Sequence, residues 1–380
     1  MLIALTGQGA MSYAGQTMVW IALSLWFFGL FLLWRIPLCR DNSGTVPPFS
    51  IIVPARNEAH TLPVLLESIH NQDLQPQEII VVDDHSEDGT ASVANAHGAR
   101  VLTAPELPAD WLGKPWACWQ GAQQTGAEVL VFLDSDTRLQ PGGLGRILRA
   151  YQKTGGLISL WPYHQMEKSY ERLAAVFNLI IMASLRVFTP LGTRLKPLGA
   201  FGPCVVCSRR DYFQVGGHKQ VRDAVLEDIA LGQCFLSSGL PVRCFAGRGA
   251  LSIRMYPQGL NSLVEGFSKG MAAGAGRSSP LILALMVGFI SGGLISAAFL
   301  GASLIRMEMV LPWIGLYALY AVQISWQLSR LGNYRFYTAL LYPVPLIFFA
   351  LIMVHSLIRT HLLKQVVWKG RNISVKKDKP

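Results

Sequence analysis

The segment from Val129 to Asp136 constrains the fold more than any other part of the chain. It reads Val-Leu-Val-Phe-Leu-Asp-Ser-Asp, so five apolar residues end abruptly in two carboxylates. An unbroken apolar run with β-branched and aromatic members is typical of a strand buried on both faces of a sheet. Asp134 and Asp136 then fall at the carboxyl end of that strand, where open α/β sheets bind their ligands.

These two carboxylates favour a metal site. Neighbouring carboxylates repel each other unless a cation lies between them, and their oxygens suit Mg²⁺ or Mn²⁺. A metal held by only one or two carboxylates usually also holds a substrate phosphate. A bare Asp-x-Asp is more often a turn or a helix cap, so this interpretation depends on the rest of the chain.

From Phe49 to about Lys153 the pattern alternates between strand and helix. Strands are expected at 50–53, 78–82, 100–103, 129–133 and 157–160, and helices at 61–71, 91–97, 115–125 and 144–153. Strands separated by helices of this length indicate βαβ units and a mostly parallel sheet. We therefore predict an α/β fold with a Rossmann-like sheet.

Three of the expected strands end in polar clusters. The clusters are Pro54-Ala55-Arg56-Asn57-Glu58, the run Asp83-Asp84-His85-Ser86-Glu87-Asp88-Gly89-Thr90, and Asp134-Ser135-Asp136. Because parallel strands align their carboxyl ends, the clusters should converge on one crevice, which weakens the turn-only interpretation. Asp83 and Asp84 are suited to accept hydrogen bonds from a base or ribose. Lys114, in Gly-Lys-Pro before a helix, is suited to meet a phosphate.

A second acidic pair, Glu227-Asp228, opens an expected helix at 228–237. A carboxylate in an acceptor cleft takes the proton from an attacking hydroxyl. We assign this role to Asp228 in preference to Glu227. The alternative is that the pair only stabilises the positive end of the helix dipole.

The four acidic and polar motifs together resemble those of the family 2 inverting glycosyltransferases. The matching stretches are Pro-Ala-Arg-Asn-Glu, Val-Val-Asp-Asp-His-Ser-Glu-Asp-Gly-Thr, Asp-Ser-Asp and Leu-Glu-Asp, over roughly residues 49–269. The resemblance implies a GT-A fold, a nucleotide-diphosphate-sugar donor, Mg²⁺ or Mn²⁺, and a single displacement at the anomeric carbon. It also implies that Asp84 contacts the nucleotide, Asp136 the metal, and Asp228 acts as base. Asp134 would then lie nearer the ribose or a metal-bound water.

The Gln-x-x-Arg-Trp motif of processive members is incomplete here. The corresponding stretch, Leu251-Ser252-Ile253-Arg254-Met255-Tyr256, keeps Arg254 for a diphosphate contact but lacks the Gln and the Trp. This argues against polymer synthesis. Gly-Gly-His at 216–218, Leu-Glu-Asp-Ile-Ala-Leu-Gly and Arg-Met-Tyr-Pro look most like membrane carotenoid glycosyltransferases. A carotenoid is therefore the favoured acceptor, and a diacylglycerol, ceramide-like, hopanoid or polyprenyl phosphate lipid is the alternative.

The predicted site residues form four groups. They are the nucleotide-sugar-binding residues Pro54, Ala55, Arg56, Glu58, Asp83, Asp84, Lys114, Asp134, Ser135 and Arg254, the metal ligands Asp136 and Asp134, the catalytic residues Asp228 and Glu227, and the acceptor-side residues His218 and Tyr256. Cys204 and Cys207, in a C-x-x-C without a partner pair, are expected to be ordinary buried thiols.

The composition indicates a membrane protein. Hydrophobic residues make up 51% of the 380 and charged residues only 15%. The stretch 17–36, whose apolar run 18–34 is followed by Arg35 and Arg40, predicts a transmembrane anchor whose C-terminal end is cytoplasmic. The tail after His355 holds seven basic residues against one acidic residue and supplies +6 of the net charge of +10. Beside a membrane segment, such a tail favours anionic lipid headgroups over nucleic acid.

We expect an integral protein of a bacterial cell membrane or internal membrane. It would have an anchor (17–36), a cytoplasmic catalytic domain (49–270), C-terminal membrane segments (281–358) and a basic cytoplasmic tail (359–380). The short apolar segment near 171–188 is expected to lie in the interface or against the domain. The apolar stretches at 281–305, 310–328 and 338–358 would, if all spanned, leave the tail outside. One is therefore expected to be re-entrant or interfacial, with a break at Tyr342-Pro343.

Three other classes fit the sequence less well. Asp134-Ser135-Asp136-Thr137 resembles the nucleophile loop of aspartyl-phosphate phosphatases, but those proteins want Thr or Val where Arg138 stands. A non-catalytic membrane scaffold would not need acids at every strand end. A Rossmann dehydrogenase is excluded because no Gly-x-Gly-x-x-Gly follows the first strand.

Overall fold

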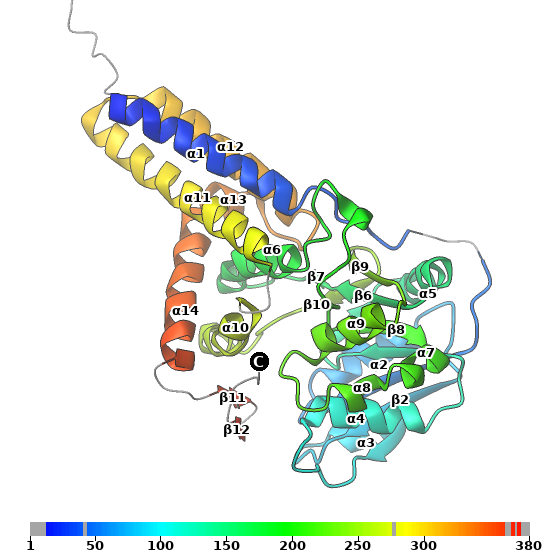
Figure 1. Ribbon diagram of the computed structural model, residues 1–380. Coiled ribbons are helices and arrows are strands. Elements are labelled where there is room, and N and C mark those ends of the chain that lie inside the picture. Colours follow the sequence, from blue (N-terminus) through cyan, green and yellow to red (C-terminus); the bar gives the residue numbers. More distant parts are fainter. Residues whose placement is uncertain (1–12, 41–43, 276–278, 362–365, 369–370, 374–380) are drawn as a thin grey trace, which may run out of the picture.

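The computed structural model describes residues 13–40, 44–275, 279–361, 366–368 and 371–373. Figure 1 shows an α/β domain from which a group of long helices extends. Most of the predicted basic tail, 359–380, lies outside the described residues.

The first half of the α/β domain follows the predicted alternation closely. Its elements are β1 (Phe49–Ala55), α2 (Leu62–His70), β2 (Glu78–Asp83), α3 (Thr90–Ala96), β3 (Arg100–Thr103), α4 (Gly113–Gln123) and β4 (Val129–Leu133). The second half is less regular. It contains β5 (Thr137–Leu139), α5 (Gly143–Thr154), β6 (Leu157–Trp161), β7 (Tyr163–His164), β8 (Cys204–Ser208), α7 (Arg209–Gln214), α8 (Gly217–Gln220), α9 (Glu227–Ser237), β9 (Val242–Ala246) and β10 (Leu251–Ile253).

The main sheet has seven strands in the order β3-β2-β1-β4-β8-β6-β9. All neighbouring pairs are parallel except those of β8, which runs antiparallel to both β4 and β6. The predicted mostly parallel sheet is therefore confirmed, and the antiparallel strand was not foreseen. A second sheet, β5-β10-β7, lies at the carboxyl end of β4. Cys204 and Cys207 on β8 are buried free thiols, as expected.

Alternate residues of the central strands supply two separate cores. Ile51, Val53 and Val131 belong to one hydrophobic cluster, which contains the buried side chains of α2 and α5. Ile52 and Leu130 belong to the other, which contains those of α4, α6 and α9. Because both faces are covered, each strand is an unbroken apolar run, and polar residues begin only where the strand leaves the sheet.

Three long helices lie side by side and extend away from the domain (Figure 1). They are α1 (Tyr13–Leu32), α11 (Pro280–Arg306) and α12 (Val310–Leu328), and α1 contacts both of the others. By length and composition, the segments Gly15–Leu32 and Pro280–Arg306 are apolar enough to cross a membrane. Polar groups join the bundle internally: Gln327 Nε2 donates to the Gly29 carbonyl over 2.8 Å, and the Tyr320 hydroxyl donates to the Ala22 carbonyl over 3.1 Å.

The remaining helices lie outside this three-helix bundle and the main sheet. They are the 3₁₀ turns η1 (Ser169–Ala174) and η2 (Gly192–Arg194) and the helices α6 (Ala175–Ser184), α10 (Leu260–Ala275), α13 (Phe336–Leu340) and α14 (Pro343–His361), followed by the short hairpin β11 (Val366–Trp368) and β12 (Arg371–Ile373). The predicted break at Tyr342-Pro343 is confirmed, since one helix ends at Leu340 and the next begins at Pro343. Most of α6 is buried against its neighbours.

The helix α14 turns back toward the α/β domain. It contacts α10, α6 and η1, and the Ser356 hydroxyl donates to the Ser268 carbonyl of α10 over 2.7 Å. The loop between α12 and α13 is also fixed to the domain. His164 N–H donates to the Leu331 carbonyl over 2.8 Å, and Asn333 N–H donates to the His164 carbonyl over 3.0 Å. The helices and the α/β domain are thus connected by hydrogen bonds as well as by packing.

Gly29 allows the helices of the bundle to approach closely. A methyl group on its Cα would overlap the Phe289 ring of α11 and the Gln323 amide of α12, whereas Gly301 on α11 faces open space. We expect Gly29→Ala to destabilise the protein by about 1–3 kcal/mol through overpacking. Gly301→Ala should be neutral or slightly stabilising, because alanine favours the helix. Thermal unfolding in detergent measures both, and equal melting temperatures for the two variants would contradict this packing.

Candidate active site

Lys114 lies at the centre of the candidate active site. Its Nζ is 2.9 Å from Asp134 Oδ1, at the end of β4. It is also 3.2 Å from Glu227 Oε1 and 3.3 Å from Asp228 Oδ2, both at the start of α9. One ammonium group therefore joins the end of the central strand to a helix from a distant part of the chain.

The local sequence explains how Lys114 reaches this position. It is the second residue of α4, and the preceding Leu112 has an extended backbone whose N–H donates to the Arg222 carbonyl over 2.8 Å. Arg222 is in turn paired with Asp110, at 2.6 Å between Nε and Oδ2. Pro115 follows in the first turn, where its missing N–H costs nothing. The start of the helix, and with it Lys114, is thus anchored beside α9.

The charges of this cluster shift one another's protonation. Burial alone would lower the pKa of Lys114, but Asp134, Asp228 and Glu227 hold it well above the value of a free lysine. Burial raises the pKa of Asp228 to about 7, with Lys114 opposing this rise and Glu227 reinforcing it. A carboxylate with a pKa near neutrality is suited to act as a general base.

The first two polar clusters are joined by hydrogen bonds. The Asn57 N–H donates to Ser86 Oγ over 2.9 Å, and Asn57 Oδ1 accepts from the Glu87 N–H over 2.8 Å. Arg56 Nη1 donates to the Asp84 carbonyl over 3.1 Å and lies 3.5 Å from Asp84 Oδ2. The loops that follow β1 and β2 therefore form one surface, as the alignment of parallel strands requires.

Asp84 keeps an acceptor available in this surface. The residue is 4% exposed, and its Oδ1 has no hydrogen-bond partner among the described residues. Its neighbour Asp83 accepts a hydrogen bond from the Ser86 N–H over 3.3 Å. A buried acceptor without a donor costs about 1–3 kcal/mol, so a ligand N–H or O–H that reaches Asp84 Oδ1 would be favoured.

Asp136 and Asp134 have the chemistry of a site for a hard divalent cation. Its crowded surroundings and the charges of Asp134 and Glu58 raise the pKa of Asp136 to about 7, although its side chain stays open to solvent. Across the described ranges, no group of three or more His, Cys, Asp or Glu side chains forms a complete metal site. The donor set therefore suits a cation held by one or two carboxylates, whose other positions are left for water or phosphate oxygens.

An apolar cavity of about 370 Å³ opens beside Asp228. Glu227 and Asp228 are the charged residues of its lining, and Tyr256 also contributes. The far wall consists mainly of apolar side chains from four helices, α6, α10, α11 and α14, and includes Ser184 of α6. Leu283 and Val287 of α11 line it and are 39% and 55% exposed, so the cavity extends from the two carboxylates to the outer surface of the helices.

His218 lies away from this cavity, which corrects its expected acceptor-side position. It is 2% exposed, its Nδ1 is 2.8 Å from the Tyr212 hydroxyl, and its ring packs on Phe132. Gly216 and Gly217, both with positive φ, turn the chain so that the imidazole enters the core. Tyr256, by contrast, lines the cavity.

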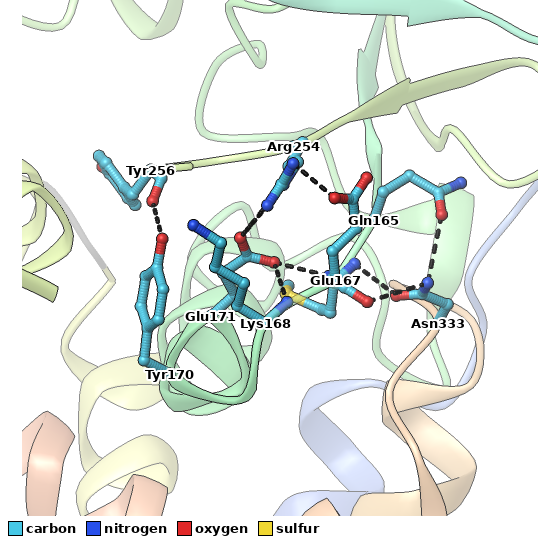
Figure 2. Close-up of polar contacts among 9 residues, drawn as sticks. Gln165, Glu167, Lys168, Tyr170, Glu171, Arg254, Tyr256 and Asn333 are labelled. Atoms are coloured by element: carbon cyan, nitrogen blue, oxygen red, sulfur yellow. Dashed lines mark hydrogen bonds and ion pairs between the residues drawn. The ribbon is translucent and has the colours of Figure 1, made fainter. Parts of the chain in front are cut away.

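The two cations expected to meet phosphate are both paired with carboxylates. Lys114 has the three acidic partners described above. Arg254 Nη1 lies 2.6 Å from Glu167 Oε2, and its Nη2 lies 2.9 Å from Glu171 Oε1 (Figure 2). Neither was expected to have these partners, because ion pairs between distant segments leave no pattern in a single sequence.

Gly202 is a further residue that sequence reasoning missed. It lines the cavity, and a methyl group on its Cα would overlap Asp228 Oδ2 and crowd Lys114 Nζ. Its sequence context, Ala200-Phe201-Gly202-Pro203, shows no motif. Only glycine leaves the Asp228 carboxylate room beside the ammonium.

The arrangement of the sheet and of the polar strand ends defines a fold of the GT-A class. The mannosyltransferase PcManGT from Pyrobaculum calidifontis, solved in complex with GDP-Man and Mn²⁺, matches the fold with a TM-score of 0.52 and 17% identity. The match covers 90% of this chain and 99% of that one.

The sequence comparisons identify the family. The model of the glycosyl transferase family 2 matches residues 50–218. The 4,4'-diaponeurosporenoate glycosyltransferase of Staphylococcus aureus (strain USA300) is 35% identical over 334 residues, which cover 87% of this chain and 89% of that protein. The chain belongs to glycosyl transferase family 2.

Gly202→Ala tests the packing around Asp228. If Asp228 is the base expected from the sequence, displacing its carboxylate by about 1 Å costs on the order of 100-fold in rate, so we expect kcat to fall by about that factor while the melting temperature changes little. Gly126→Ala, at a glycine that faces open space, is the matched control. Wild-type kcat in Gly202→Ala would show that the Asp228 carboxylate has freedom to move.

Lys114→Met tests the electrostatic link to Asp228. Because Lys114 lowers the pKa of Asp228, its removal should raise that pKa, and the loss of an opposite charge nearby is worth about 1–3 pH units. A base is active when deprotonated, so the acidic limb of the plot of kcat against pH should move to higher pH. The exposed Lys219→Met serves as control. If the acidic limb does not move in Lys114→Met, Asp228 is not the group whose titration limits kcat at low pH.

Proposed function

We propose that this enzyme is a membrane-bound, metal-dependent inverting glycosyltransferase. It transfers one sugar from a nucleotide-diphosphate-sugar donor to a hydroxyl or carboxyl group of a carotenoid. The relative from Staphylococcus aureus, named for action on diaponeurosporenoate, supports a carotenoid acceptor.

The apolar cavity carries this proposal. It leads from Glu227 and Asp228 to the exposed face of α11, and its walls between these points are almost entirely aliphatic or aromatic. Such a cavity suits a long hydrocarbon whose single polar end must reach a carboxylate. A water-soluble sugar or sugar polymer would leave these walls unused. The acceptor can therefore remain partly in the lipid while its end group reacts.

Exposed apolar side chains support the membrane location. Trp20 on α1, Ile305 on α11 and Val322 on α12 are 67%, 86% and 68% exposed. Soluble monomers rarely expose apolar surface on this scale. The catalytic domain (49–270) would lie outside the bilayer, with the anchor (17–36) and the segments at 281–358 in or on it.

Basic residues favour a cytoplasmic catalytic domain. Arg35 follows α1, and Arg330 and Arg335 follow α12, at the ends of these helices that adjoin the domain. By the positive-inside rule these ends face the cytoplasm. Since α14 turns back to contact α10, we propose that it stays on the cytoplasmic side of the bilayer. The basic tail then lies inside without a further crossing.

The polar strand ends would bind the donor. In this proposal Asp84, with its unpaired Oδ1, accepts from the nucleotide, and the loop residues Pro54, Ala55, Arg56, Glu58, Asp83 and Ser135 shape that part of the site. Asp136 and Asp134 would hold the metal. When bound, Mg²⁺ or Mn²⁺ neutralises charge on the departing diphosphate. Lys114 keeps the Asp134 carboxylate in place.

Asp228 would act on the acceptor. It takes the proton of the acceptor hydroxyl, the oxygen attacks the anomeric carbon, and the bond from that carbon to the nucleoside diphosphate breaks on the opposite side. Attack from the side opposite the leaving group inverts the anomeric centre. Glu227, beside it, helps to keep the pKa of Asp228 near neutrality. A carboxylate acceptor arrives already deprotonated and would depend less on this base.

A transfer assay with membranes that contain the protein tests the proposal. Labelled UDP-glucose and GDP-mannose would be supplied with a hydroxylated carotenoid, a carotenoid carboxylic acid, a diacylglycerol, a ceramide and a polyprenyl phosphate. We expect transfer to a carotenoid that is abolished by a chelator and by Asp136→Asn. Ser184→Phe, which places a ring in the cavity, should lower kcat/KM for the acceptor by about tenfold or more and leave donor affinity unchanged.

Ser24→Phe is the matched control for the cavity variant. Both serines lie on helices and donate to a carbonyl one turn earlier, but Ser24 faces outward on α1. An equal fall in kcat/KM for the acceptor in both variants would show that the cavity does not bind the acceptor. Transfer to diacylglycerol without any transfer to a carotenoid would show that the acceptor is a glycerolipid and not a carotenoid. Transfer that survives both the chelator and Asp136→Asn would overturn the metal assignment.

A further inference from the structure

Arg254 leaves the second sheet beside the acids expected to hold the metal. In the antiparallel pair of β10 and β5, Ile253 lies opposite Thr137. The next residue on one strand is Arg254, and the preceding residue on the other is Asp136. The backbone of Arg254 therefore adjoins the place where a metal-bound diphosphate would lie.

Glu171 fixes one edge of the Arg254 guanidinium. Arg254 Nε and Nη2 donate to Glu171 Oε1 over 3.1 and 2.9 Å (Figure 2). The other oxygen, Oε2, accepts from the backbone N–H groups of Glu167 and Lys168 over 2.6 and 3.0 Å. Glu171 is 1% exposed, and both of its oxygens are hydrogen-bonded. A buried carboxylate satisfied in this way is costly to disturb, so it serves as a rigid anchor.

Glu167 occupies the remaining edge and is easily replaced. Its Oε2 lies 2.6 Å from Arg254 Nη1, but its side chain is 63% exposed. Exposed ion pairs contribute about 0–1 kcal/mol. The planar guanidinium of arginine binds phosphate oxygens and carboxylate oxygens with the same bidentate geometry. An arriving phosphate can therefore take the place of Glu167 without disturbing Glu171.

The surrounding backbone is fixed on both sides. The Tyr170 hydroxyl donates to the Tyr256 carbonyl over 2.8 Å. Tyr256 has a φ of 56°, which is rare for a bulky residue. On the other side, Asn333 Oδ1 accepts from the Met166 N–H over 2.6 Å, and Asn333 Nδ2 donates to Gln165 Oε1 over 3.3 Å (Figure 2). With both backbones held, the exposed Glu167 side chain is the part of the network that can move freely.

We propose that Glu171 is a positioning residue that presents Arg254 Nη1 to the diphosphate of the donor, and that Glu167 is an exchangeable anion which this diphosphate displaces. The inference rests on the proposed nucleotide-diphosphate-sugar donor and adds two residues to its site. It assigns opposite effects to two glutamates that lie four positions apart on the same segment. Removal of the anchor weakens diphosphate binding, and removal of the exchangeable anion strengthens it.

Equilibrium binding of UDP and GDP to the full-length protein in nanodiscs, with Mn²⁺ present, tests the proposal. Glu167→Gln should lower the Kd of whichever nucleotide the wild type binds by about two- to fivefold. The change is small because the diphosphate no longer has to break an exposed ion pair, which is weak. Glu171→Gln should raise it by about tenfold, because a charge-assisted anchor is lost. The Kd values of the monophosphates UMP and GMP, which lack the second phosphate, should change less than those of the diphosphates. Glu128→Gln, at an exposed residue before β4, should have no effect.

A double variant separates a specific effect from a general change in charge. In an Arg254→Met background the guanidinium is absent, so Glu167→Gln should no longer tighten diphosphate binding. Melting temperatures show whether each variant is folded, and the solvent-exposed Glu167→Gln tests the proposal even if Glu171→Gln unfolds. An unchanged or raised diphosphate Kd in Glu167→Gln, or the same tightening without Arg254, would overturn the proposal.

The outcome also separates this inference from the proposed function. If the variants shift diphosphate binding as expected but no lipid is glycosylated, the acceptor assignment fails and the role of Glu171 stands. If lipid is glycosylated and neither glutamate affects diphosphate binding, only the present inference fails. Wild-type protein that binds neither UDP nor GDP with Mn²⁺ would remove the basis of both.

Discussion

The contact of Lys114 with three carboxylates is the interaction on which the rest of the site depends. Asp134 lies at the end of the central strand, and Glu227 and Asp228 begin α9. Without a cation between them, these partly buried carboxylates would repel each other. The ammonium instead holds the two elements together. As a result, the acids proposed to act on donor and acceptor are fixed relative to each other by a single side chain. The need for glycine at 202 follows from the same contact, because a side chain there would overlap the Asp228 carboxylate and crowd the ammonium.

Two chemically different surfaces meet at this cluster. The proposed donor side consists of loops at the carboxyl ends of parallel strands, whose backbone and carboxylate groups are polar. The proposed acceptor side is lined mainly by apolar side chains of α6, α10, α11 and α14, and it reaches the exposed face of α11. A family 2 domain alone would provide the first surface. The second exists only because the helices that follow the domain pack back against it, so the reaction site and the apolar attachment surface are parts of one structure.

The sequence was most informative where a run of one residue class ended sharply. The limits of β3, β4 and α12 were predicted as found, and the helix break at Tyr342-Pro343 was foreseen. The antiparallel strand β8 was missed, because its direction depends on pairing with β4 and β6, which lie far away in the chain. Likewise, the partners of Arg254 and the aliphatic lining of the cavity come from separate segments and share no motif. His218 was misplaced, since two glycines turn its ring into the core.

The state of the cations has a consequence for how a donor would bind. Lys114 faces three acids, and Arg254 faces Glu167 and Glu171. Asp136 adds a further negative charge close to Asp134 and Glu58. The site is therefore anionic before a donor arrives, and a bare diphosphate would be repelled. Two proposed changes would reverse this: the binding of a divalent cation with the diphosphate, and the departure of the exposed Glu167 from Arg254. Both act on the leaving group, whereas Lys114 can stay with its acids, so the proposed base keeps its environment throughout donor exchange.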